Sequence, residues 1–230
     1  MSASTPVSIY DLDRTITSVP TWSFFLLFAA RRIAPWRLLL APMLPFLAAG
    51  KAIGLYSRDR LKELMHRTML GARVPPAALA AVTEDFADRM VARHIRPGTL
   101  AQIATDRAEG RRLVIATASH AFVAAPIAKR LGIDDLVATR ARYDDAGNLL
   151  HRLAGANCFG GAKHAALLRW LAEAGIERGG VSIRFYSDDI SDIATLGWAD
   201  EPVAVNPGAA LRRLAVANGW PVRDWGGRSR

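Results

Sequence analysis

Residues 7–15 read VSIYDLDRT, a short and mostly apolar run followed by two acidic residues and a threonine. A run of this length that ends in polar residues is typical of a buried strand. Asp11 and Asp13 lie two residues apart where the strand turns into a loop, so both carboxylates point towards one place. Taken alone the motif is weak, because Asp and Thr after a strand are also ordinary turn and helix-capping residues.

The same rhythm recurs along the chain. Further apolar runs occur at residues 113–116, 181–186 and 202–205. Helical patterns lie before or after them, at residues 100–109, 121–131, 163–174 and 209–218. This alternation predicts an α/β fold in which helices cover both faces of a parallel sheet.

Residues 18–96 differ from this rhythm because they have helical patterns and no strand signal. They predict an all-helical insert after the first strand of a core formed by residues 1–17 and 97–230. One helical face of the insert gathers apolar side chains that we interpret as its core: Leu61, Leu64, Met65, Thr68 and Met69. Residues 139–155 alternate around a turn sequence and predict a β-hairpin.

Other polar residues follow the later strands or begin the helices after them. Thr117 and Ser119 end the second core strand, Lys163 follows Gly160-Gly161 at a helix start, and residues 187–192 read SDDISD. Each has an ordinary explanation: a capping hydroxyl, a solvated lysine and an acidic loop. Because ligands of open α/β sheets bind at the carboxyl ends of the strands, we expect these groups to converge on Asp11.

Such a set suits phosphoryl transfer. A phosphate ester repels a carboxylate nucleophile, so attack requires a cation and fixed donors. Magnesium prefers carboxylates together with carbonyl, water and phosphate oxygens, which suits Asp11 and Asp188. Thr117 and the backbone N–H groups near Leu12 and Ser119 are candidate donors, and Lys163 adds a positive charge. Asp13 is placed to protonate the leaving group and then to activate water.

Four motifs carry a resemblance to a known family: DLDRT (11–15), ATAS (116–119), GGAK (160–163) and SDDISD (187–192) resemble those of the haloacid dehalogenase superfamily. The place of the insert, GANCFGGAK (155–163) and AVNP (204–207) are similar to its phosphoserine phosphatase-like subclass IB. The resemblance implies a Rossmann-like core, a helical cap formed by the insert, Mg²⁺, and an aspartyl-phosphate intermediate.

The roles that the resemblance implies cover the whole candidate site. Asp11 is the nucleophile, Asp13 the acid and base, and Lys163 a catalytic cation. The phosphate and substrate ligands are Leu12, Thr117, Ala118, Ser119 and Arg14. The metal ligands are Asp11, Asp13, Asp188 and Asp192, of which Asp192 supports either the metal or Lys163.

The sequence departs from that of phosphoserine phosphatases at a position that bears on the substrate. Those enzymes carry a glutamate shortly after the first motif. Residues 16–30 contain no acidic residue, so phosphoserine is a poor match. Arg14 stands where a small residue is often found in related enzymes. It faces the cap and either contacts a second anionic group of the substrate or is simply solvated.

Residues 22–51 are strongly apolar and basic. Net charge is +9 for the chain, and residues 14–98 hold 13 Lys and Arg against 5 Asp and Glu. The uncharged run 38–50 is 13 residues long and contains Pro42 and Pro45, too short to span a bilayer. The composition suits either peripheral contact with a membrane or packing of the helices on each other or on a second subunit. This apolar, arginine-rich stretch after the first motif and the sequence YSD (186–188) at the fourth loosely resemble the phosphatidylglycerophosphatase C family. That resemblance extends the membrane interpretation to a lipid head-group phosphate as substrate.

Three alternatives stay open at this point: a soluble phosphatase acting on a small metabolite, such as a phosphoserine-like compound, an amino-alcohol phosphate or phosphocholine; a phosphotransferase; and a basic binding protein. Nucleic acid is a poor partner, because the acidic cluster repels phosphate unless a metal is present. Cys158, the single cysteine, excludes an intrachain disulfide and suits a reducing compartment. The first residues have no signal-peptide pattern, so we expect a cytoplasmic enzyme, in the membrane interpretation peripheral at the inner face. The oligomeric state is left open.

Overall fold

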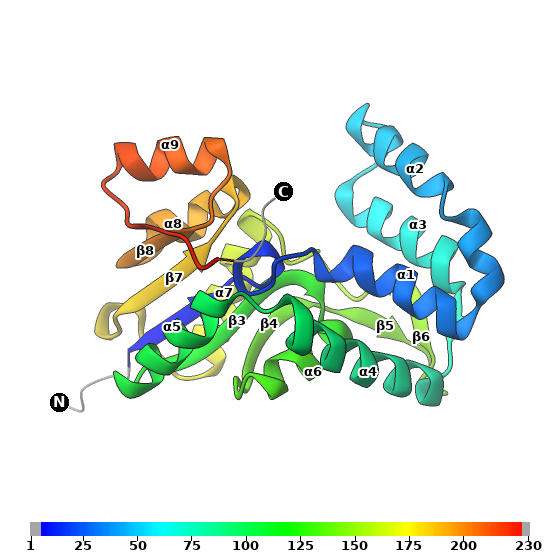
Figure 1. Ribbon diagram of the computed structural model, residues 1–230, viewed down its shortest axis with the longest axis horizontal. Coiled ribbons are helices and arrows are strands. Elements are labelled where there is room, and N and C mark those ends of the chain that lie inside the picture. Colours follow the sequence, from blue (N-terminus) through cyan, green and yellow to red (C-terminus); the bar gives the residue numbers. More distant parts are fainter. Residues whose placement is uncertain (1–5, 227–230) are drawn as a thin grey trace.

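The computed structural model describes residues 6–226 (Figure 1). Its main sheet has six strands in the order β4-β3-β1-β7-β8-β9, and every neighbouring pair is parallel. The strands are β1 (Val7–Tyr10), β3 (Arg112–His120), β4 (Asp135–Thr139), β7 (Ile183–Ser187), β8 (Glu201–Val205) and β9 (Val222–Arg223). Strand β1 therefore lies near the middle, between β3 and β7.

Helices cover both faces of this sheet. One face packs against α5 (Pro97–Ala108) and α6 (Ala121–Arg130), and the other against α7 (Gly161–Glu173), α8 (Ile193–Trp198) and α9 (Ala209–Ala217). Successive residues of β1 point to opposite sides, because Ile9 lies in one apolar cluster and Tyr10 in the other. Two 3₁₀ turns, η3 (Arg178–Gly180) and η4 (Ile190–Asp192), flank β7. The predicted α/β fold is confirmed.

The insert contains α1 (Thr21–Ile33), the 3₁₀ helix η2 (Pro35–Leu40), α2 (Met43–Ala52), α3 (Arg58–Leu70) and α4 (Pro76–His94). Figure 1 shows α2 lying over α3, with α1 below them. A bridge between Thr17 and Ile95 joins the two ends of the insert to each other. The division into a core and a cap stays a prediction, although its proposed boundaries fall at this bridge.

One short strand departs from the all-helical expectation for the insert. Strand β2 (Arg73–Val74) pairs antiparallel with β6 (Leu149–Leu153), which itself pairs with β5 (Ala141–Tyr143). Two residues are too few to carry an alternating pattern, so the sequence gives no signal for β2. Strands β5 and β6 form the predicted hairpin, and β2 extends it into a three-stranded sheet.

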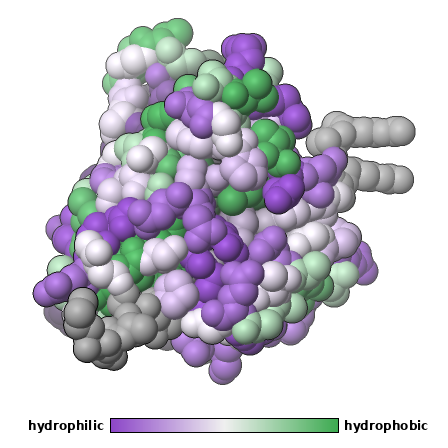
Figure 2. All heavy atoms as spheres, turned by 90° about the vertical axis from the view of Figure 1, so that its left-hand side faces the viewer, coloured by the Kyte–Doolittle hydropathy of each residue, from purple (hydrophilic) through white to green (hydrophobic). Residues whose placement is uncertain are grey.

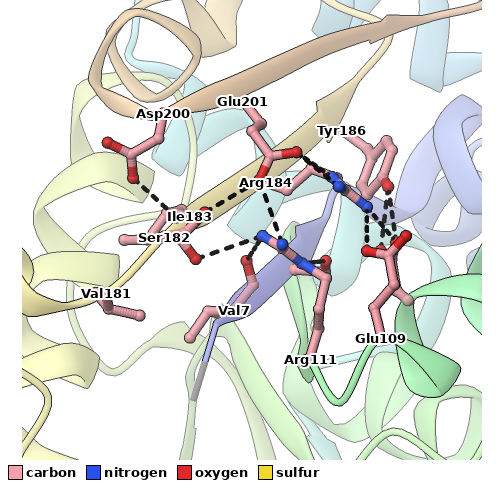
Figure 3. Close-up of polar contacts among 12 residues, drawn as sticks. Val7, Glu109, Arg111, Val181, Ser182, Ile183, Arg184, Tyr186, Asp200 and Glu201 are labelled. Carbon is pink, nitrogen blue, oxygen red and sulfur yellow. Dashed lines mark hydrogen bonds and ion pairs between the residues drawn. The ribbon is translucent and has the colours of Figure 1, made fainter. Parts of the chain in front are cut away.

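Charged side chains connect the amino-terminal halves of the strands (Figure 3). Arg184 of β7 lies between Glu201 and Glu109, with nitrogen–oxygen distances of 2.6 and 3.0 Å. It also pairs with the fully buried Asp106 at 2.7 Å, and Asp106 accepts a hydrogen bond from the Tyr10 hydroxyl at 2.5 Å. Burial alone would raise the pKa of Asp106, but these hydrogen bonds and Arg184 hold that pKa below its usual value.

Replacing Asp106 by alanine is expected to destabilise the protein strongly. The variant leaves the Arg184 charge and the buried Tyr10 and Tyr186 hydroxyls without their shared acceptor. Breaking a buried ion pair from one side costs roughly 3–5 kcal/mol. Denaturant unfolding measures the loss. Glu109→Ala removes a half-exposed partner of the same arginine and is expected to cost about 1 kcal/mol or less; equal losses would contradict this explanation.

Candidate active site

Asp11 lies at the carboxyl end of β1. Its backbone N–H donates to the carbonyl of Tyr186 at 2.9 Å, which continues the pairing of β1 with β7 by one residue. The residue is 6% exposed and lies at the edge of the sheet at which the neighbouring strands β3 and β7 also have their carboxyl ends. The position is the edge of the sheet at which α/β proteins place their ligands.

Lys163 is the immediate partner of Asp11. Its ammonium nitrogen is 2.8 Å from Asp11 Oδ1 and 2.7 Å from Asp192 Oδ2, and all three side chains are buried. Ser187 donates to the same Asp192 oxygen at 2.7 Å. Burial alone would lower the pKa of Lys163, but the two carboxylates outweigh it and raise that pKa, so the ammonium stays charged. In the structure Asp192 therefore holds Lys163 against Asp11.

The turn after β1, η1 (Leu12–Ile16), arranges the other acidic side chains. Thr15 Oγ1 lies 3.1 Å from Asp11 Oδ2 and 3.2 Å from Asp188 Oδ1, within hydrogen-bonding distance of both carboxylates. Asp13 is not helical, and Arg14 has a left-handed backbone with φ of 62°. This tight turn keeps Asp11 and Asp13 on the same side of the chain.

Asp13 is held by two hydroxyl residues. One oxygen, Oδ1, accepts from the backbone N–H of Thr21 at 2.7 Å and from its hydroxyl at 2.6 Å. The other, Oδ2, accepts from the hydroxyl of Ser119 at 3.1 Å. These bonds fix the carboxylate without covering it, because Asp13 still lines a cavity.

A cavity of about 320 Å³ brings most of the candidate residues together. Of the residues identified from sequence, its lining includes Asp11, Asp13, Arg14, Ala118, Lys163, Asp188 and Asp192. Three others are not part of that lining. Leu12 and Thr117 are fully buried, and the Thr117 hydroxyl accepts a hydrogen bond from the backbone N–H of Ser119 at 3.0 Å. Ser119 instead lines the neighbouring cavity.

Comparison with known proteins identifies the family. The model of the haloacid dehalogenase-like hydrolases matches residues 9–197, a range that contains all four motifs and the cavity. The chain belongs to this family. It is an enzyme with a hydrolase fold, as the resemblance implied. Members of the family generally use Mg²⁺.

Relatives of this hydrolase include named phosphatases. It is 29% identical over 156 residues to a histidinol-phosphatase of Neisseria meningitidis, which covers 67% of this chain and 70% of that protein. It is 36% identical over 154 residues to phosphoserine phosphatase SerB1 of Mycobacterium tuberculosis, which covers 65% of this chain and 47% of the relative. The chain thus spans less than half of the mycobacterial protein.

Solved structures show the same fold. A Bordetella pertussis protein of unknown function is 27% identical, has a TM-score of 0.87, and is matched over 97% of this chain and all of its own. A phospho-aspartyl intermediate analogue of phosphoserine phosphatase has a TM-score of 0.62 at 15% identity, over 91% of this chain and 90% of its own. This more distant likeness supports the Rossmann-like core.

The acidic residues of the hydrolase suit a magnesium ion. Burial and the nearby Asp192, Asp188 and Asp13 raise the pKa of Asp11 despite Lys163. Burial and Asp189 raise the pKa of Asp188 to about 6. Burial is the larger cause of both shifts, and the neighbouring carboxylates add to it; a divalent cation bound here would stabilise the charged form of both side chains. No group of three acidic, His or Cys side chains within residues 6–226 gathers as a ready metal cluster, so a site on Asp11 and Asp188 needs carbonyl, water or phosphate oxygens, as Mg²⁺ prefers.

A second cavity of about 190 Å³ adjoins the first, because Asp13, Pro20, Arg58 and Ala118 line both. Its other lining residues come from α1, α3, the end of β3 and the loop before α7: Trp22, Ser23, Leu61, Lys62, Met65, Ser119 and Asn157. Lys62 is almost fully buried and donates to the carbonyl of Ala118 and to Asn157 Oδ1. Burial lowers the pKa of Lys62 to about 7.

Several residues of the two cavities were missed from sequence. Arg58 and Lys62 read as ordinary charged residues of a helical insert, and Thr15 and Thr21 as ordinary hydroxyl residues. The expected apolar face of α3 is also wrong in part: Met69 is buried, but Leu61 and Met65 line the cavity while Lys62 and His66 are buried. The sequence offers no distinguishing signal for the two basic residues, because Arg58 and Lys62 stand directly before Asp59 and Glu63.

Proposed function

We propose that this hydrolase is a magnesium-dependent phosphatase that removes phosphate from a monoester through a phospho-aspartate on Asp11. The position of Asp11 supports this proposal: it is a nearly buried carboxylate in contact with a charged lysine, in the lining of a cavity that also holds Asp13 and Asp188. Attack by an Asp11 oxygen forms a bond to phosphorus as the ester P–O bond breaks. Asp11 and Asp188 would hold Mg²⁺, which would supply positive charge to balance the phosphoryl oxygens.

Asp13 is the residue that transfers protons in this proposal. In its protonated form it gives a proton to the departing alkoxide; as a carboxylate it then takes a proton from the water that hydrolyses the phospho-aspartate. Thr21 and Ser119 orient it towards the cavity. Lys163 stays charged and stabilises the transferring phosphoryl group, with Asp192 as its second partner.

The proposal is tested by phosphate release with and without Mg²⁺. A panel contains p-nitrophenyl phosphate, soluble metabolite phosphates and a phosphatidylglycerophosphate in mixed micelles. We expect activity that EDTA removes and Mg²⁺ restores. Transfer of phosphate to an added alcohol instead of water would assign a phosphotransferase, and no turnover of any monoester would refute the proposal.

We infer the class of the leaving group from the second cavity. Lys62 and Arg58 bring positive charge to a lining that is otherwise largely apolar, with Trp22, Leu61 and Met65. A buried ammonium is costly without an anionic partner, so the cavity suits an alcohol with a carboxylate or similar anion beside an apolar part. A substrate ammonium group finds only Asp13 as an acidic partner in this lining. Small metabolite phosphates with an acidic group are therefore the preferred candidates, ahead of amino-alcohol phosphates.

Lys62→Met is expected to raise KM roughly 10- to 100-fold for a phosphate ester that carries a second anionic group. This factor corresponds to the binding free energy lost with one hydrogen bond to a charged group. The change is expected to be small for p-nitrophenyl phosphate, which lacks the anion. Because the pKa of Lys62 is about 7, its charge is present below that pH and lost above it. In the wild type, KM for the anionic ester is therefore expected to rise as the pH passes 7.

The variant itself supplies the check on this pH effect. Lys62→Met has no group to titrate, so its KM for the anionic ester is expected to stay level where the wild-type value rises. Lys129→Met, an exposed lysine on α6, is the matched control and keeps wild-type kinetics. A wild-type rise that persists in Lys62→Met would assign the titration to another group.

A further inference from the structure

Helix α2 presents an apolar side to solvent. Of its ten residues, MLPFLAAGKA, only Gly50 is buried, and Leu44 packs inward against the core. Lys51, its one charged residue, is half-buried. The exposed residues are Met43, Pro45, Phe46, Ala48, Ala49 and Ala52, none of which has a polar side chain. Surface helices of soluble proteins normally carry polar residues on this side.

The apolar surface continues beyond α2. We define the tip patch as Trp36, Leu39, Met43, Phe46, Ile53 and Leu55, whose exposed fractions range from 49% to 82%. Figure 1 places α2 at the outer edge of the insert, and Figure 2 shows hydrophobic side chains at the top of the molecule, at the height of this helix. A group of large apolar residues with this exposure marks a surface that binds another protein or a membrane.

The charge around the tip patch favours a negatively charged binding partner. Residues 31–55, which include the tip patch, contain four Lys and Arg and no Asp or Glu; of the four, Arg32 pairs with Asp85. Arg31 and Lys51 have no ion-pair partner within residues 6–226. Trp36 stacks with Arg37, whose guanidinium carbon is 4.5 Å from the ring centre. Apolar side chains, a tryptophan and unpaired basic groups are the combination that binds at the interface of an anionic bilayer.

A second copy of the chain fits this surface less well. A two-fold dimer through the tip patch places the same surface of both copies face to face. The basic residues of the segment 31–55 would then oppose each other without an acidic partner from the same segment. Like charges across an interface disfavour association, whereas anionic lipid head groups supply the missing counter-charge.

We propose that the tip patch docks this protein on the surface of an anionic phospholipid bilayer, with η2 and α2 lying along the interface. No helix among residues 6–226 is long and apolar enough to cross a membrane, so the contact is peripheral. Helix α3, which packs under α2, carries Arg58 and Lys62 of the second cavity. Docking therefore brings one wall of the leaving-group cavity near the lipid surface. The proposal concerns binding and does not depend on the phosphatase activity.

Co-sedimentation with vesicles tests the proposal. We expect the wild type to pellet with vesicles of equimolar phosphatidylcholine and phosphatidylglycerol, and far less with phosphatidylcholine alone. The double variant Leu39→Ser/Phe46→Ser is expected to lower the partition coefficient roughly tenfold or more, because two large apolar side chains no longer enter the bilayer. Val216→Ser, a change of an equally exposed apolar residue on α9, is the matched control and is expected to bind like the wild type.

Charge and oligomeric state complete the test. Lys51→Glu is expected to weaken binding to the mixed vesicles, and Lys129→Glu on α6 is not. Circular dichroism confirms that each variant is folded. Wild-type binding in Leu39→Ser/Phe46→Ser, or equal binding to both kinds of vesicle, would overturn the proposal. So would a wild-type dimer in light scattering that this double variant dissociates, because the binding partner would then be a second copy.

Discussion

Asp11→Asn is expected to remove phosphatase activity, by a factor on the order of 10⁴ or more, as for the loss of a covalent nucleophile. An amide has the shape of the carboxylate but is a poor nucleophile, so no phospho-enzyme forms. The folded structure is expected to persist, since Lys163 keeps its second partner, Asp192, at 2.7 Å. Steady-state phosphate release and acid-quench trapping of labelled enzyme measure the two effects.

Asp134→Asn is the matched control for this substitution. It makes the same change from acid to amide at an exposed residue before β4, outside both cavities. We expect full activity and a wild-type phospho-enzyme signal. If Asp11→Asn retained substantial turnover while remaining folded, another residue would have to be the nucleophile.

The location of the site at the carboxyl ends of the strands was predictable from sequence for a topological reason. In a parallel sheet the ends of β1, β3 and β7 meet at one edge, so polar residues that follow them lie close together without any knowledge of side-chain packing. Asp11 and Asp188, which this rule brings together, both line the first cavity, whereas Thr117, expected there by the same rule, is fully buried. The motif order then identified the family, which the match over residues 9–197 shows.

The insert was less predictable because its packing depends on rotations of helices that sequence patterns do not fix. The periodic stripe of α3 pointed to Leu61 and Leu64, whereas the structure turns Lys62 and His66 inward. Lys62 is buried because Ala118 and Asn157, far away in the sequence, accept its hydrogen bonds. Lysine is rarely buried without such partners, so its position could not be inferred locally.

The carboxylates and their hydroxyl partners show the same limit. Thr15 lies close to both Asp11 and Asp188, and Thr21 fixes Asp13 together with Ser119. Threonine near the start of a helix is usually a cap, so the sequence favours that interpretation. Thr21 is indeed the first residue of α1, yet its hydroxyl serves the carboxylate of the preceding loop. The insert thereby positions a candidate catalytic group as well as covering it.

Asp13→Asn is expected to slow the hydrolysis of alkyl phosphates by roughly 10²- to 10⁴-fold, the usual contribution of a general acid. An alkoxide is a poor leaving group without a proton, and an amide cannot provide one. The p-nitrophenolate of p-nitrophenyl phosphate leaves without protonation, so formation of the phospho-enzyme from this substrate is expected to stay close to the wild-type rate. Stopped-flow absorbance follows that step directly.

The second half-reaction gives this variant a distinct kinetic signature. Water attacks the phospho-aspartate only slowly when no carboxylate accepts its proton, so Asp13→Asn is expected to release a burst of p-nitrophenol followed by a slow steady state. Thr21→Val, which removes one hydroxyl from Asp13 Oδ1 but keeps the carboxylate, is expected to lower the rate much less. Equal loss of the burst and of the steady-state rate in Asp13→Asn would show that Asp13 acts by holding the loop or the metal. The role of proton donor and acceptor would then belong to a different residue.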